Sequence, residues 1–215
     1  MLRKYPIVTG HIYHIFNRGV NRGNIFFEDQ DYKRFIRVAT HYLTNNSTYS
    51  HTISDPVSAP VSESRVQRVL VQGYCLMPNH FHFLIKQLMD GGITWYMQHL
   101  ANSYSHYIHL KYKRTGPLFD GRFKNILVET DEQLVHVSRY IHLNPIVSNL
   151  VSSLESYPWS SYLKYIDVKY DDLVDPDMIL GYFKSVKDYK GFVLDQVEYG
   201  RELEKIKHLI LDLEG

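Results

Sequence analysis

Apolar and polar side chains are arranged along the first 150 residues in a pattern that predicts four strands and three helices. Runs rich in β-branched and aromatic residues, bounded by turn signals, predict strands at 11–19, 66–77, 80–86 and 121–129. Apolar residues at helical spacing predict helices at 28–43, 91–116 and 130–144. The last of these helices is expected to open at Thr130 or Asp131 and to stop at Pro145.

The resulting order of elements, β-α-β-β-α-β-α, predicts an α+β fold. It matches a ferredoxin-like, split βαβ sheet with one added helix. Residues 45–65 are rich in Ser and Thr and contain two prolines, so we expect a long, flexible loop between the first helix and the second strand.

The end of the chain has a different character. Helical stretches are expected at 177–190 and 198–213. We therefore expect a domain over 1–163 and a mostly helical, acidic C-terminal extension over 164–215.

Composition favours a globular protein of the cytoplasm. Hydrophobic residues make up 44% of the chain and aromatic residues 14%, which is ample for a packed core. No apolar run approaches the roughly 20 residues that span a bilayer, so no membrane partner is expected. Cys75 is the only cysteine, which excludes a disulfide framework and favours a reducing compartment.

Charge is unevenly distributed along the chain. Residues 1–150 hold 16 Lys and Arg against 10 Asp and Glu, a net of +6, whereas residues 151–215 hold 8 against 13, a net of −5. A basic body permits a polyanionic ligand, although many proteins with such an asymmetry have none.

Two histidines one residue apart provide the first chemical signal. Side chains alternate faces along a strand, so His80 and His82 are expected to point to the same side of the sheet. Two neighbouring imidazoles suit a shared metal ion, because neutral histidine is a common ligand. A hydrogen-bonded pair without metal fits the same spacing equally well.

The helix expected at 130–144 offers a second group of functional side chains. Tyr140 and Asn144 lie four residues apart and therefore on one helix face. Tyrosine is a nucleophile in some enzymes, and the amide oxygen of asparagine is a metal ligand. The structural alternatives are core packing for Tyr140 and a helix cap for Asn144.

Several segments, taken together, resemble one family in their order along the chain. They are "NRGVNRGNIFF" (17–27), "GYCLMPNHFHFLI" (73–85), "GPLFDGRFKNILVE" (116–129), "YIHLNPIVSNLV" (140–151) and "YPWSSY" (157–162). The chain resembles the single-tyrosine HUH transposases, also called IS200-like transposases, and among them the REP-associated tyrosine transposases of bacteria. "MPNHFH" and "YIHLNP" carry most of the resemblance.

The resemblance implies a function and a set of roles. It implies a transposase that cleaves and rejoins single-stranded DNA at hairpin repeats through a phosphotyrosine intermediate. Tyr140 is the implied nucleophile, and the implied metal ligands are His80, His82 and Asn144. The implied cofactor is Mg²⁺ or Mn²⁺, although imidazole ligands alone favour zinc or another transition metal. The implied acting unit is a monomer or a homodimer.

DNA must also be held, and protons must be moved. Basic residues after the first strand and around the fourth strand are candidates for phosphate contacts: Arg18, Arg22, Lys111, Lys113, Arg114, Arg122 and Lys124. His136, one turn before Tyr140, and the nearby His142 are candidates for proton transfer, and core packing is the alternative for both.

Three other functions compete with DNA transposition. A catalytically silent DNA-binding protein, such as a repressor of repeat elements, fits the same fold. An RNA-binding sheet would leave the histidine pair unexplained. A zinc hydrolase would need a general base near the metal, and the sequence holds no "HExxH".

Overall fold

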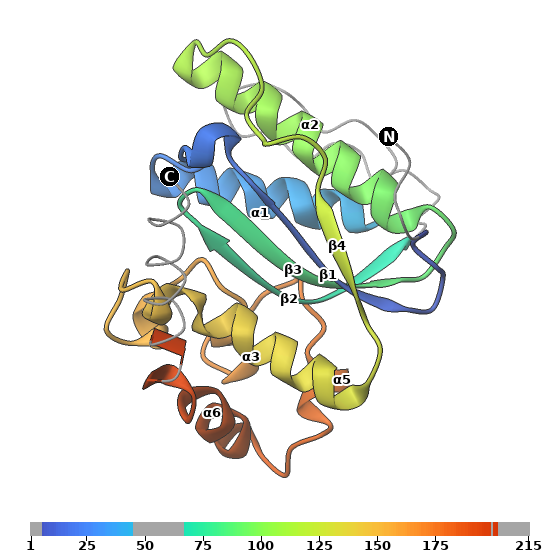
Figure 1. Ribbon diagram of the computed structural model, residues 1–215, viewed down its shortest axis with the longest axis vertical. Coiled ribbons are helices and arrows are strands. Elements are labelled where there is room, and N and C mark those ends of the chain that lie inside the picture. The colour runs from blue at the N-terminus through green and yellow to red at the C-terminus, as the bar shows by residue number, and fades with distance from the viewer. Residues whose placement is uncertain (1–5, 45–66, 199, 202–215) are drawn as a thin grey trace, which may run out of the picture.

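The computed structural model describes residues 6–44, 67–198, 200 and 201 (Figure 1). Its main elements follow one another as β1 (Ile12–Arg18), α1 (Asp29–Thr44), β2 (Val69–Met77), β3 (His80–Gln87), α2 (Gly92–Tyr112), β4 (Lys124–Val128) and α3 (Asp131–Val147). The expected order of strands and helices is therefore confirmed. The loop expected at 45–65 lies outside the described residues.

The four strands form one antiparallel sheet in the order β2-β3-β1-β4. β3 and β1 are the two central strands, with Phe16 of β1 opposite His82 of β3. This strand order is that of a ferredoxin-like split βαβ fold, and it confirms the predicted α+β class.

Helices cover both faces of the sheet (Figure 1). α1 and α2 lie on one face, where the ring of Phe35 packs against Phe81, Phe83 and Tyr104 with ring centroids 4.9 to 6.1 Å apart. α3 lies on the other face. Because strand side chains alternate, the residues of β1 and β3 that do not enter the α1–α2 core point toward α3.

α3 begins as the sequence predicts but ends later. The Thr130 side chain accepts a hydrogen bond from the Gln133 amide at 3.1 Å, which is an N-cap. Pro145 does not stop the helix, which continues to Val147. A proline in the last turn removes a single backbone hydrogen bond, and the Ile141 carbonyl that loses its partner lies 3.5 Å from Asn144 Nδ2.

The C-terminal segment packs against the outer side of α3. It contains η2 (Leu154–Ser156), α4 (Tyr162–Tyr165), α5 (Asp177–Leu180) and α6 (Val186–Leu194). The single helix expected at 177–190 is wrong, because the chain turns between α5 and α6. The helix expected at 198–213 lies largely outside the described residues.

Buried residues of this segment continue the core of the sheet. Ile179, Tyr189 and Val193 belong to the same hydrophobic cluster as β1 and β3. The domain boundary at residue 163 stays a prediction. No helix in the described part of the chain is both long and apolar enough to cross a membrane.

A buried carboxylate joins the start of α1 to the end of α2. Asp31 accepts hydrogen bonds from Lys111 Nζ at 2.6 Å, Tyr112 Oη at 2.8 Å and Tyr107 Oη at 3.1 Å. Burial alone would lower the pKa of Lys111, but its hydrogen bonds to Asp31 and Glu28 outweigh this effect and raise the pKa above its usual value. Lys111 therefore stays charged and compensates Asp31.

We expect Lys111→Met to reduce the free energy of unfolding by about 3 kcal/mol, because it leaves the buried Asp31 carboxylate without its cation. Urea denaturation followed by circular dichroism measures this change. The control is Lys33→Met, an exposed lysine of α1, for which a change within about 0.5 kcal/mol is expected. Equal stabilities for the two variants would contradict the role given to Lys111.

Candidate active site

Three imidazoles gather on the α3 side of the two central strands. His80 and His82 project from β3 to the same side, with ring centroids 5.0 Å apart. His14 projects from β1 beside them, and its ring stacks on His82 with centroids 5.0 Å apart. His82 is only 5% exposed and His80 is half-buried, so the cluster opens toward solvent at its His80 end.

Tyr140 of α3 lies over this cluster. Its ring meets His82 edge to face at a centroid distance of 5.5 Å and His14 at 5.8 Å. The side chain is 44% exposed, so the phenol is accessible to a substrate.

Asn144 lies one turn further along α3. Its amide nitrogen donates to the Tyr140 carbonyl at 2.8 Å. The amide oxygen therefore points away from that carbonyl and has its lone pairs available to a ligand.

Each β3 histidine has a hydrogen-bond partner at Nδ1. His14 Nε2 lies 2.8 Å from His82 Nδ1, and Asn79 Oδ1 lies 2.6 Å from His80 Nδ1. Asn79 in turn donates from Nδ2 to the carbonyl of Arg22 at 3.1 Å. Burial lowers the pKa of His14 to about 4, so this imidazole is neutral at physiological pH.

The three candidate ligands, His80, His82 and Asn144, would suit a divalent ion whose other ligands are water or phosphate oxygens. His80 and His82 would supply imidazole nitrogens, and Asn144 would supply an amide oxygen. Within the described residues, no group of three or more His, Cys, Asp and Glu side chains is arranged to hold a metal. Two imidazoles and one amide oxygen would leave coordination positions for water or phosphate oxygens.

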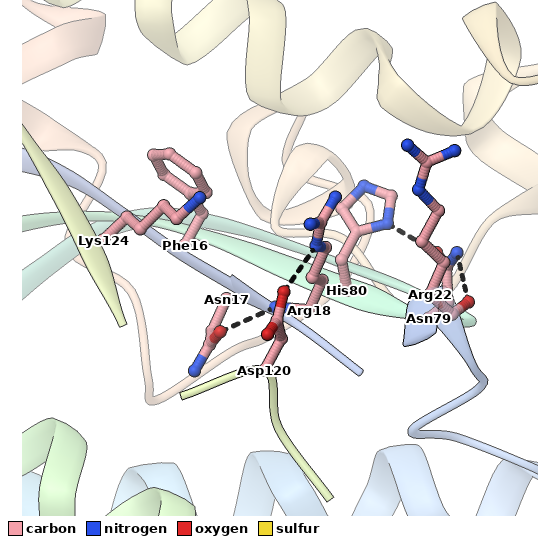
Figure 2. A pocket seen from close by; sticks show the side chains of 8 residues that line it. All are labelled: Phe16, Asn17, Arg18, Arg22, Asn79, His80, Asp120 and Lys124. Atoms are coloured by element: carbon pink, nitrogen blue, oxygen red, sulfur yellow. Dashed lines mark hydrogen bonds and ion pairs between the residues drawn. The ribbon is translucent and has the colours of Figure 1, made fainter. Parts of the chain in front are cut away.

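A basic pocket of about 370 Å³ adjoins the histidines (Figure 2). It is lined by Phe16, Asn17, Arg18, Arg22, Asn79, His80, Asp120 and Lys124. Figure 2 shows that Arg18, His80 and Arg22 point to the same side of the sheet, whereas Asn17 points to the other. Three cations against one carboxylate make this pocket suitable for an anionic ligand.

The loop after β1 holds Arg22 in an uncommon conformation. Asn21 and Arg22 both have positive φ, at 53° and 58°. Close approach explains the glycines around them, because a Cβ on Gly19 would lie 2.0 Å from the Gly23 carbonyl oxygen. The "NRGVNRG" sequence therefore encodes a tight loop that places Arg22 beside the pocket.

The other predicted phosphate-binding residues are not part of this pocket. Lys111 is bound to Asp31 and Glu28, with 17% of its side chain exposed, and this ion pairing removes it from the candidate phosphate contacts. Arg114 lies over the ring of Phe27 at 5.7 Å. Lys113 and Arg122 are exposed on the surface, outside the pocket lining.

Both candidates for proton transfer have partners other than Tyr140. His142 is buried on the opposite side of α3, between Tyr189 Oη and Ser161 Oγ, both 2.7 Å away. Burial lowers its pKa to about 3, so it stays neutral and links α3 to the C-terminal segment. His136 contacts Arg139 and the ring of Phe192.

Sequence reasoning missed His14, Asn79 and Phe16. The alternation "HIYHIF" carried a signal for two of them, because it places His14 and Phe16 on one face of the first strand. The missing information was strand order, since only the pairing of β1 with β3 brings that face beside His82.

Comparison with known proteins finds one matching family model. Residues 61–144, which contain His80, His82, Tyr140 and Asn144, match the family model described as IS200-like transposase. A search of curated proteins finds no match.

Among solved structures, the chain is similar to a REP-associated tyrosine transposase bound to a REP hairpin, with a TM-score of 0.54. The match has 14% sequence identity and covers 81% of this chain and 93% of that chain, which shows a shared fold. The family model thus links residues 61–144, less than half of the chain, to the IS200-like transposases, and the solved structure shares the fold of the chain.

Proposed function

We propose that this protein is a transposase that cleaves and rejoins single-stranded DNA through a covalent phosphotyrosine on Tyr140, with a divalent metal held by His80, His82 and Asn144. The observation that carries the proposal is the contact of Tyr140 with His82 at a centroid distance of 5.5 Å. The proposed nucleophile thus lies on the same side of the sheet as the two potential metal ligands, in a cluster that opens to solvent at its His80 end.

The covalent step conserves the energy of the phosphodiester. The Tyr140 oxygen attacks the phosphorus and forms a tyrosyl phosphodiester, while one of the two bonds from phosphorus to a sugar oxygen breaks. The phenol loses its proton, and the departing sugar oxygen gains one. A DNA hydroxyl can reverse this step and join strands, whereas attack by water would only hydrolyse them.

The metal-binding residues leave room for substrate. Two imidazoles and one amide oxygen leave other coordination positions for water and phosphate oxygens, which suits Mg²⁺ or Mn²⁺. A divalent ion in this place supplies charge stabilisation at the scissile phosphate. His80, at the open end of the cluster, borders the basic pocket and so connects the metal site to bound DNA.

Solvent is the proposed acceptor of the phenolic proton. Tyr140 is 44% exposed, so the residue is open to water. His136 contacts Arg139, and His142 contacts Tyr189 and Ser161.

The basic pocket is proposed to hold the DNA strand beside the scissile phosphate. Arg18, Arg22 and Lys124 supply the positive charge, and Phe16 supplies an aromatic face on which a base can stack. The structural relative is bound to a REP hairpin, which supports a hairpin-bearing strand as the ligand here too. One chain brings Tyr140 to its own histidines, which supports a monomer as the acting unit.

A catalytically silent DNA-binding protein remains the second candidate. Binding requires the basic pocket but gives no reason for an accessible tyrosine against two imidazoles. That arrangement favours catalysis, and an assay for covalent DNA adducts separates the two functions.

We expect Tyr140→Phe to abolish covalent DNA adducts while leaving DNA affinity within about twofold, because the change removes only the phenolic oxygen. The substrate is a labelled pool of single-stranded oligonucleotides, each with a hairpin stem flanked by randomised sequence, incubated with Mn²⁺. Denaturing gel electrophoresis detects the adduct, and fluorescence anisotropy measures affinity.

The matched control for Tyr140→Phe is Tyr182→Phe, because Tyr182 is similarly exposed, at 45%, but lies near α5. This control should form the adduct at the normal yield. A normal yield from Tyr140→Phe would identify another nucleophile, and hairpin binding by the natural protein without any adduct would establish the silent function.

We expect Arg22→Ala and Lys124→Ala each to weaken DNA binding and to flatten its salt dependence. Loss of one phosphate contact should reduce the slope of log affinity against log salt by about 0.7 for a single strand. Affinities measured across a salt series test this expectation. Lys187→Ala, on the exposed side of α6, is the control and should leave the slope unchanged; an unchanged slope in both pocket variants would exclude the pocket as the DNA site.

We expect Asp120→Asn to tighten DNA binding several-fold. Asp120 pairs with Arg18 at 3.1 Å and is the only carboxylate among the residues that line the pocket, so the change removes repulsion of phosphate and releases Arg18. The gain should shrink as salt rises, because both groups are about half exposed and therefore screened. Weaker binding by Asp120→Asn would contradict this electrostatic account.

A further inference from the structure

A metal-binding histidine must present the correct ring nitrogen. Neutral imidazole carries a proton on one nitrogen and a lone pair on the other, and only the lone pair binds metal. A neighbour that accepts a hydrogen bond from one nitrogen therefore prepares the other nitrogen for the ion.

The tautomer of His80 follows from a chain of fixed hydrogen bonds. The backbone carbonyl of Arg22 can only accept, so the group of Asn79 that faces it at 3.1 Å is the NH₂. The amide oxygen of Asn79 must then face His80 Nδ1 at 2.6 Å. An oxygen in that position accepts, so neutral His80 carries its proton on Nδ1 and its lone pair on Nε2.

His82 is held by a different partner through the same nitrogen. Its Nδ1 lies 2.8 Å from His14 Nε2, and the two rings are stacked at an interplanar angle of 25°. Metal can then reach His82 only at Nε2, which requires the proton on Nδ1 and makes His14 the acceptor. His14 Nε2 therefore faces His82 and accepts the hydrogen bond that holds the His82 ring in place.

We propose that His14 and Asn79 are positioning residues that hold the two β3 imidazoles in the tautomer that presents Nε2 to a divalent ion. The inference rests on the proposed metal role of His80 and His82. Each proposed ligand is thus held by a residue outside β3. His14 of β1 holds His82, and Asn79, which the Arg22 loop orients, holds His80.

The arrangement also connects the DNA pocket to the metal site. Arg22 lines the basic pocket with its side chain and orients Asn79 with its carbonyl. A shift of this loop would therefore disturb the tautomer of His80 as well as the pocket.

The tautomers are observable in the metal-free protein. Long-range ¹H–¹⁵N correlation spectra of the ¹⁵N-labelled full chain above pH 7 should show His80 and His82 protonated at Nδ1. Single His80→Ala and His82→Ala variants assign the two signals. Protonation at Nε2 in both residues would overturn the proposal without any need for a variant of His14 or Asn79.

Metal affinity provides a second readout that does not depend on catalysis. Isothermal titration with Mn²⁺ should give an affinity about 10- to 100-fold weaker for His14→Leu, which has no acceptor, and about 10-fold weaker for Asn79→Ala. His14→Gln and Asn79→Asp keep an acceptor oxygen and should stay within about threefold of the natural chain. Melting temperatures, measured without metal, verify that each variant is folded.

His82→Ala separates failure of this inference from failure of the proposed function. If His82→Ala loses Mn²⁺ binding while His14→Leu and Asn79→Ala bind as tightly as the natural chain, the positioning role is wrong and the metal site stands. If His82→Ala binds Mn²⁺ normally, the metal site itself is wrong and the inference falls with it.

Discussion

The candidate site depends on the antiparallel pairing of β1 with β3. The register sets Phe16 opposite His82 and Arg18 opposite His80, so the polar faces of the two central strands become one surface. A slip of one residue would turn His14 into the α1–α2 core and bring Ile15 beside His82, because strand side chains alternate. The buried aromatic residues on the opposite face, such as Phe83, fix the register by the same alternation.

α3 completes the site because it is held from both sides. Its inner face carries Tyr140 over the histidines, whereas its outer face carries His142 into a buried network with Tyr189 and Ser161. Ser161 Oγ also accepts a hydrogen bond from the Tyr74 amide of β2 at 2.8 Å, which ties this network to the sheet. The partly exposed Tyr140, the proposed nucleophile, thus lies on a helix that is packed on both sides, and the C-terminal segment contributes to that packing.

The sequence was sufficient to predict the four strands and the three main helices. It was also sufficient to predict pairs of candidate site residues that lie on the same strand or helix. The spacing of His80 and His82, and that of Tyr140 and Asn144, follows from the periods of a strand and a helix. Pro145 misled the prediction, because the helix continues to Val147 although Pro145 cannot donate a hydrogen bond to the Ile141 carbonyl. The single helix expected at 177–190 was also mispredicted, because the chain turns between α5 and α6.

Contacts between elements could not be predicted in the same way. His14 and Asn79 reach the site through strand pairing and through a loop carbonyl, neither of which leaves a periodic pattern in the sequence. Lys111 shows the converse. It looked like part of a basic cluster, but the packing of α2 on α1 places it against Asp31.

The central claim is that Tyr140 becomes covalently bound to DNA, and mass spectrometry of the digested adduct tests it most directly. Trypsin should release residues 140–164 as one peptide, which also contains Tyr157 and Tyr162, both buried. After incubation with hairpin-bearing single strands and Mn²⁺ and digestion of the DNA by nuclease, fragmentation should place the remaining nucleotide phosphate on Tyr140. Cleaved DNA with a nucleotide on another residue, or with none on the protein, would contradict the account.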